Sequence, residues 1–165
     1  MTTPSGDHQH RAERGRWVGR WWALALACVA VVATTTLMWS DWAIGVWGSM
    51  VAFAMGVQPE ATTTVMTVRT WGDADLHVIV WGSTALLVLS ALPGTHRRLI
   101  AAAALFAWSA VVELAQPWFT AQRSLQWTDL LGNGIGILAA LAMMLLAHGL
   151  SARARRRSQA PAARP

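Results

Sequence analysis

The chain has 165 residues, of which 55% are hydrophobic and only 13% are charged. A soluble domain carries about a quarter charged residues. Here the charges cluster between long uncharged stretches, which argues against a soluble helical bundle and predicts bilayer spans. The net charge of +5 comes from arginines that crowd the two termini and one short loop, so it favours membrane topology over nucleic-acid binding.

The N-terminal residues 1–16 are polar, and we expect them to form a disordered cytoplasmic tail. The first predicted span lies near residues 17–39. Tryptophans stand at both of its edges, where indole rings meet lipid headgroups. The run is too long for the hydrophobic part of a cleaved secretory signal.

A shorter apolar segment follows at residues 42–57, below the roughly 17–25 residues that a span needs. A helix drawn through it has bulky side chains on one side and small ones on the other. The small face comprises Gly45, Gly48, Ser49, Ala52 and Gly56. This pattern predicts an interfacial or re-entrant helix that packs on the bundle by its small face. The Thr-rich segment at residues 61–71 is weakly typical of an extended strand.

Three further spans are predicted, and they lie near residues 75–92, 99–116 and 128–150. Pro93-Gly94 stops the first of them, Pro117 ends the next, and Thr128 is the expected N-cap of the last. The predicted fold is therefore all-α, a polytopic membrane helix bundle of four transmembrane helices plus the short helix, over residues 17–150. The arginine-rich residues 151–165 are predicted to be a disordered cytoplasmic tail.

Arginine counting gives these spans a direction. The N-terminal segment, the loop after the second span and the C-terminal tail are arginine-rich, whereas the two intervening connections hold one arginine each. Because arginine-rich loops stay cytoplasmic, we expect a multi-pass protein of the bacterial plasma membrane with both termini in the cytoplasm. A fifth span at residues 42–57 would put an arginine-rich region on the wrong side.

Polar residues inside or beside the spans form three pairs at helical spacing, on the side opposite the predicted cytoplasmic face. The candidate ligand-binding residues are Asp73, His77, Glu113, Gln116, Arg123, Asp129 and Asn133. Spacings of three or four place both members of a pair on one helix face. Polar groups at membrane depth are costly enough to suggest a function.

Small residues follow on the last span at the same level. Gly132, Gly136 and Ala140 recur every four residues, which predicts a close approach between this span and its neighbours.

Structural explanations also exist for most of the candidates. An aspartate at the head of a span can cap that helix, Arg123 can extend to headgroups, and His77 can be an interfacial hydrogen-bonded histidine. Glu113 lies near the C-terminal end of its span, where the helix dipole disfavours an anion. It therefore needs a partner, either Arg123 or His77, and its structural alternatives are an ion pair or a protonated acid.

These residues in this order resemble the VanZ-like family. The resemblance covers roughly residues 71–144 and rests on Asp73-Ala-Asp-Leu-His77, Glu113-Leu-Ala-Gln116, Gln122-Arg123-Ser124 and Asp129-Leu-Leu-Gly-Asn133-Gly-Ile-Gly136. The lysine that the family has after the first aspartate is Ala74 here, and the tyrosine often found four residues after the histidine is Trp81.

The resemblance implies a small bacterial membrane protein of the cell envelope. The founding member of the family is associated with low-level resistance to the glycopeptide teicoplanin. The molecular activity of the family is not established, so the resemblance implies a context and no reaction.

Three functions are compatible with the sequence. The first is an accessory protein in which Arg123 contacts an anionic group of a lipid-linked cell-wall precursor, a headgroup or a glycopeptide. The second is an intramembrane enzyme acting on a lipid-phosphate substrate, with His77 and Asp73 as a general base and Glu113 as an acid. The third is a small transporter, which fits less well because internal repeats are absent and the polar residues are peripheral.

The sequence leaves catalysis, the ligand and the oligomeric state open. Asp73, His77, Glu113 and Asp129 are able to bind a divalent metal, but their spacing matches no strong metal signature, so no metal or cofactor is predicted. The expected partners are membrane lipids and the envelope ligand just named, without nucleic acid.

Overall fold

The computed structural model describes residues 5–60, 74–121 and 126–159, and all of its regular structure is helical. The helices are α1 (Ser5–Met38), α2 (Trp42–Val57), α4 (Ala74–Ala91), α5 (Thr95–Phe119) and α6 (Trp127–Gln159). All except α2 are long and apolar enough to cross a membrane. The predicted all-α architecture of four spanning helices plus one short helix is confirmed.

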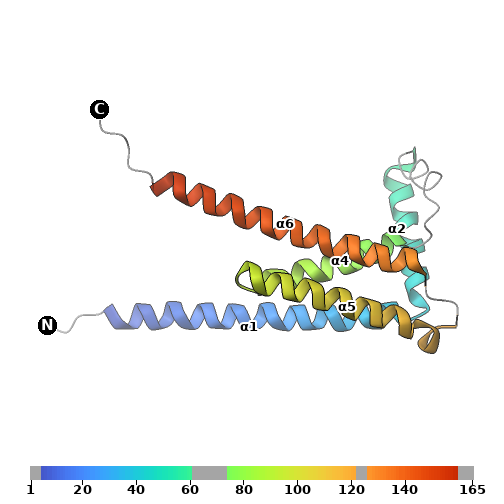
Figure 1. Ribbon diagram of the computed structural model, residues 1–165, viewed down its shortest axis with the longest axis horizontal. Helices are drawn as coiled ribbons and strands as arrows, with labels where there is room; N and C mark the ends of the chain where they lie inside the picture. The colour runs from blue at the N-terminus through green and yellow to red at the C-terminus, as the bar shows by residue number, and fades with distance from the viewer. Residues whose placement is uncertain (1–4, 61–73, 122–125, 160–165) are drawn as a thin grey trace.

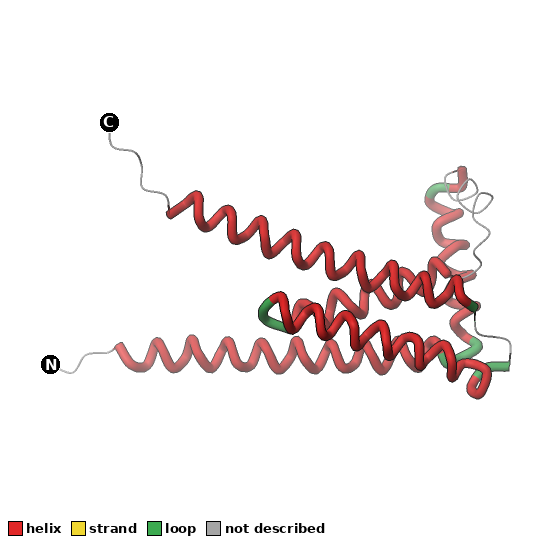
Figure 2. The backbone as a smooth tube through the Cα atoms, in the orientation of Figure 1, coloured by secondary structure: helices red, strands yellow, loops and turns green. Residues whose placement is uncertain are grey.

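The four long helices run side by side, and α2 turns away from them at one end (Figure 1). The beginning of α1, the tight turn between α4 and α5, and the end of α6 all lie at the other end, with the two chain termini (Figures 1 and 2). This arrangement agrees with an even number of crossings. It also brings the three arginine-rich segments to one end of the bundle.

The tightest contact in the bundle joins α4 to α6, and glycines make it possible. A Cβ atom built on Gly132 would lie 2.6 Å from the carbonyl oxygen of Ala74. One built on Gly136 would lie 2.9 Å from the backbone nitrogen of Gly82 and would also overlap the carbonyl oxygen of Val78. The close approach predicted from the small residues of the last span is confirmed.

The turn between α4 and α5 is closed by Arg98. Its Nε donates to the carbonyl oxygens of Leu89 and Leu92, each at 3.1 Å, so that it caps the last turn of α4. Gly94 adopts a φ of 80°, which favours glycine and lets the chain reverse. The sequence placed the basic residues 96–98 in a loop, but they lie in the first turn of α5.

The last two spans also differ from their predicted ends. Helix α5 continues past Pro117 to Phe119, because a proline in the final turn removes only one backbone hydrogen bond and Thr120 still donates its N–H to Gln116. Helix α6 begins at Trp127, so Thr128 is not its N-cap. The hydroxyl of Thr128 instead donates to Asp129 Oδ1 at 3.4 Å.

Both outer helices extend into the predicted tails. Helix α1 begins at Ser5 and α6 ends at Gln159, so the structure places helix over much of the segments 1–16 and 151–165 that were predicted to be disordered. The physical reason is that the unfavourable step of helix formation is its first turn, and a spanning helix already provides that turn. Adding alanine, arginine, glutamate and glutamine residues to an existing helix is then favourable.

Helix α2 has the predicted bounds but not the predicted packing. Its small face, Gly45, Gly48, Ser49, Ala52 and Gly56, is exposed. Within the described part of the chain, no atom lies within 4 Å of a Cβ built on any of its three glycines. Among the described residues, α2 packs against the core through its first turns, by the fully buried Ala43 and the half-buried Trp47. The prediction that α2 packs by its small face is wrong, because α2 points away from the long helices. The strand-like segment 61–71 lies outside the described residues.

Candidate functional site

Four polar side chains from three helices meet inside the bundle. We call His77 of α4, Glu113 of α5, and Asp129 and Asn133 of α6 the polar cluster. None of the four is more than 1% exposed. His77 lies in the first turns of α4 and Asp129 in the first turn of α6, whereas Glu113 lies near the end of α5. The polar cluster therefore lies near the end of the bundle opposite the termini.

Asn133 is the centre of the hydrogen bonding in the polar cluster. Its Nδ2 donates to Glu113 Oε1 at 3.0 Å, and its Oδ1 lies 2.9 Å from His77 Nδ1. His77 Nδ1 is also 3.1 Å from Glu113 Oε1. Because the amide nitrogen of Asn133 is the donor to Glu113, its Oδ1 can only accept. His77 Nδ1 must therefore carry a hydrogen, which it shares between Asn133 and Glu113.

The other ring nitrogen of His77 faces Asp129. His77 Nε2 and Asp129 Oδ2 are 3.6 Å apart, which is too long for a hydrogen bond and short enough for charge attraction. Asp129 also lies where the dipole of α6 favours an anion. The capping explanation for Asp129 and its place in the polar cluster are thus compatible.

Glycine at position 132 lets α6 reach this depth. A Cβ there would lie 3.2 Å from the Cβ of His77, in addition to its clash with the backbone of α4. Asp129 and Asn133 flank Gly132 on the same helix, so the close approach carries both of them towards His77. The sequence signal for close packing and the sequence signal for a polar site therefore coincide in space.

Of the three remaining predicted residues, only Gln116 is among the described residues, and it does not join this hydrogen-bonded group. Gln116 is fully buried one turn after Glu113, and its Nε2 donates to the carbonyl oxygen of Met38 at 3.4 Å. It thus ties α5 to the end of α1. Asp73 and Arg123 lie outside the described residues.

Three buried polar atoms near this level have no hydrogen-bond partner within the described residues. They are Trp81 Nε1, Glu113 Oε2 and Gln116 Oε1. Trp81 lies four residues after His77 and is fully buried on the same helix face. Unpaired polar groups are rare in protein interiors because each forfeits its hydration, and an ordered water or ion often accounts for them.

Sequence reasoning missed the polar contact deeper in the bundle. The hydroxyls of Thr34 in α1 and Thr84 in α4 are both buried and lie 2.6 Å apart. Thr84 is seven residues after His77, so the helical period alone places it on the same face. No comparable signal marks Thr34, which stands in a run of three threonines.

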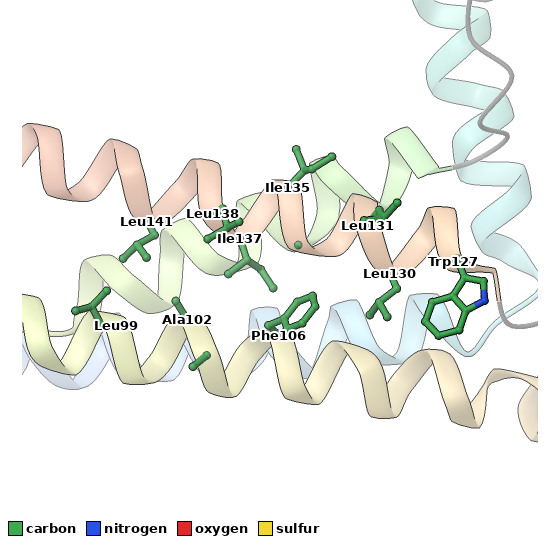
Figure 3. A pocket seen from close by; sticks show the side chains of 12 residues that line it. Leu99, Ala102, Phe106, Trp127, Leu130, Leu131, Ile135, Ile137, Leu138 and Leu141 are labelled. Carbon is green, nitrogen blue, oxygen red and sulfur yellow. The ribbon is translucent and has the colours of Figure 1, made fainter.

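A purely apolar groove lies beside the polar cluster, between α5 and α6. It has a volume of about 720 Å³, and its lining includes Leu99, Phe106, Trp127, Leu130 and Ile137 (Figure 3). Leu130 and Gly134 follow Asp129 and Asn133 in the chain but line the groove, whereas the polar residues point into the bundle. A lipid acyl chain matches the chemistry of this lining.

The polar cluster is suited to holding a cation or relaying a proton. His77, Glu113 and Asp129 each offer a ligand atom, and these atoms lie within 4.8 Å of one another. Imidazole and carboxylate groups are also the usual pairs in acid–base chemistry. No protein-family profile, curated protein or solved structure matches this chain.

Proposed function

We propose that this chain is a VanZ-like integral membrane protein of the bacterial cell envelope, in which the polar cluster supports an outward-facing site for a lipid-linked or anionic envelope ligand. The observation that carries the proposal is the convergence of His77, Glu113, Asp129 and Asn133 from three helices into one hydrogen-bonded group. These residues are four of the seven on which the resemblance and the predicted site rest.

Convergence favours a site over independent helix capping. Capping requires each acid to lie at its own helix end and makes no demand on the other helices. Glu113 lies at the wrong end of α5 for capping, yet it contacts both His77 and Asn133. Concentrating two carboxyls and an imidazole in a buried position is expensive, which is why ionisable residues at membrane depth usually mark function.

The distribution of arginines indicates the side of the membrane on which the polar cluster lies. The three arginine-rich segments belong to the end of the bundle that carries the termini, and such segments face the cytoplasm. The polar cluster then belongs to the outer leaflet. A ligand delivered from the outer surface, such as a lipid-linked cell-wall precursor or a glycopeptide, is the one that this position suits.

The test is a drug-susceptibility measurement in a glycopeptide-susceptible Gram-positive host that expresses the chain. We expect expression to raise the inhibitory concentration of teicoplanin several-fold. Arg123→Ala and Glu113→Gln should abolish that gain. The matched control is Arg97→Ala, which removes an exposed arginine near the α4–α5 turn, at the other end of the bundle. Membrane levels of each variant are measured by immunoblot, and full resistance from Arg123→Ala would overturn the proposal.

A second candidate function is an intramembrane enzyme acting on a lipid phosphate. The observation that favours it is the position of His77 between two carboxyls, with Nδ1 towards Glu113 and Nε2 towards Asp129. The purified protein should then release phosphate from a polyprenyl diphosphate in detergent, and His77→Gln should abolish the release. Inertness towards a panel of lipid phosphates, with and without divalent metal, would reject this candidate.

A further inference from the structure

The last part of α6 lies apart from the other helices. Every residue from Leu146 to Ser158 is exposed, whereas buried residues recur along α6 up to Ala140. In Figure 1, α6 continues past the α4–α5 turn and away from α1. The 33 residues of α6 extend over about 50 Å, which exceeds the roughly 30 Å of a bilayer hydrocarbon core. About 20 Å of the helix therefore lies outside that core.

Four arginines follow Leu150, the last large apolar residue of this helix. They are Arg153, Arg155, Arg156 and Arg157, and all four are exposed. At 1.5 Å per residue, Arg153 lies about 5 Å and Arg157 about 10 Å beyond Leu150 along the helix axis. The headgroup layer is about 5–8 Å deep on each side of the hydrocarbon core. Because an arginine side chain is long, all four guanidinium groups are able to contact lipid phosphates.

The charges of these arginines are not balanced within the described part of the chain. The sequence after Asp129 contains no aspartate or glutamate, and no ion pair joins the four arginines to a described residue. The helix dipole favours Arg156 and Arg157, which lie in the last turn. It does not account for the two arginines before them. Like charges this close repel one another, so an anion from outside the chain would stabilise the cluster.

Three of the four arginines share one face of α6. Arg153, Arg156 and Arg157 are separated by three and four residues, which places their side chains next to one another, whereas Arg155 lies on the opposite face. Guanidinium groups bind phosphate oxygens through parallel N–H bonds. Phospholipid headgroups supply phosphates at this depth, and a helix that is anchored in the bilayer keeps its arginines beside them at a high effective concentration.

We propose that the face formed by Arg153, Arg156 and Arg157 binds the headgroups of anionic phospholipids, such as phosphatidylglycerol. Each basic residue near an anionic membrane surface strengthens binding by about fivefold. Zwitterionic phosphatidylcholine has the same phosphate but also a fixed positive charge, so this face prefers the anionic lipid. The inference does not rest on the proposed function, because no envelope ligand and no residue of the polar cluster takes part in it.

Native mass spectrometry of the full chain in detergent tests the proposal. Phosphatidylglycerol and phosphatidylcholine with identical acyl chains are added in equal amounts. We expect the wild-type protein to bind at least about tenfold more phosphatidylglycerol, and this preference should fall as the ammonium acetate concentration rises, because salt screens exposed charges. The triple variant Arg153→Gln, Arg156→Gln and Arg157→Gln should bind the two lipids about equally. Glutamine suits this test because its helix propensity is close to that of arginine.

Two matched variants separate charge from position. The triple variant Arg153→Lys, Arg156→Lys and Arg157→Lys keeps the three charges and should keep a preference of several-fold for phosphatidylglycerol. The single variant Arg155→Gln removes one arginine from the opposite face, and it should lower the preference by about fivefold at most. Circular dichroism shows whether each variant keeps its helix content.

Equal binding of the two lipids by the wild-type protein would overturn the proposal, and so would an unaltered preference in the folded triple glutamine variant. A loss for Arg155→Gln as large as that of the triple glutamine variant would overturn the assignment to this face. Tighter binding of a single-stranded RNA than of phosphatidylglycerol would assign the arginines to nucleic acid instead. If the triple glutamine variant does not fold, the salt dependence of the wild-type protein and a larger loss for Arg156→Gln than for Arg155→Gln decide the question.

Discussion

The α4–α6 contact and helix α2 present the same kind of small-residue face and behave in opposite ways. On α6, Gly132 and Gly136 press against the backbone of α4. On α2, a Cβ built on Gly45, Gly48 or Gly56 meets no atom of the described residues within 4 Å. A face of small residues therefore permits close packing without specifying it, since dispersion contacts require a partner of matching shape.

The difference between the two regions lies in what accompanies the glycines. On α6 the small residues alternate with Asp129 and Asn133, whose side chains have partners on α4 and α5. On α2 the only polar side chain of the small face, Ser49, bonds back to the carbonyl oxygen of Gly45 in its own helix. Directional hydrogen bonds to another helix thus separate the packed face from the unpacked one.

The largest expected effect comes from filling the glycine contact. Gly136→Leu should destabilise the bundle by about 3 kcal/mol, at the upper end for overpacking, because a side chain there meets backbone atoms that have little room to move. Thermal unfolding of purified protein in detergent, followed by tryptophan fluorescence, measures the loss.

Gly48→Leu on α2 is the matched control, since the same side chain would enter open space. We expect a change in stability within about 0.5 kcal/mol. Equal losses of stability for the two leucine variants would show that α2 packs as tightly as α6. The contrast between the two small-residue faces would then be wrong.

The next effect tests whether polar contacts distinguish the two regions. Glu113→Ala should cost about 2 kcal/mol, because Asn133 Nδ2 loses its acceptor in a position that water does not reach. The control is Asp41→Ala, which removes an exposed carboxyl that makes no side-chain capping bond to α2. If both variants unfold at the wild-type temperature, hydrogen bonding contributes little and shape alone separates the two regions.

The smallest effect concerns the hydroxyl pair between α1 and α4. Thr84→Val keeps the shape of the side chain and removes the bond to Thr34, so we expect a loss of about 1 kcal/mol. Combining it with Thr34→Val in a double-mutant cycle gives the coupling of the pair. Thr36→Val, at an exposed position on α1, is the control. Additive losses in the cycle would contradict a direct interaction.

The sequence predicted the elements well where hydrophobicity alone determines them. The span containing His77 and the short helix at 42–57 have ends within a residue or so of those predicted. Pro117 was taken as a stop but lies within α5, because its effect depends on how many hydrogen bonds remain downstream. The tails differ because charge content indicates solvent exposure and does not by itself exclude helix.

The candidate site was predictable in composition and partly in geometry. Glu113 was expected to need a partner, and His77 is that partner. That Asn133 bonds to both of them depends on the rotation and depth of α6, which no spacing within one helix encodes. The buried nitrogen of Trp81 was equally unforeseeable, since an indole N–H is orphaned only by what surrounds it.

Arg98 closes the α4–α5 turn and also keeps that turn on one side of the membrane. An arginine at a membrane boundary normally resists translocation through its charge alone. The guanidinium of Arg98 is in addition fastened to two carbonyl oxygens of α4, so moving the turn across the bilayer would require opening that helix end. These hydrogen bonds therefore disfavour movement of the hairpin turn to the other side of the membrane. A lysine at this position would keep the charge but lose the guanidinium nitrogen that binds both carbonyls.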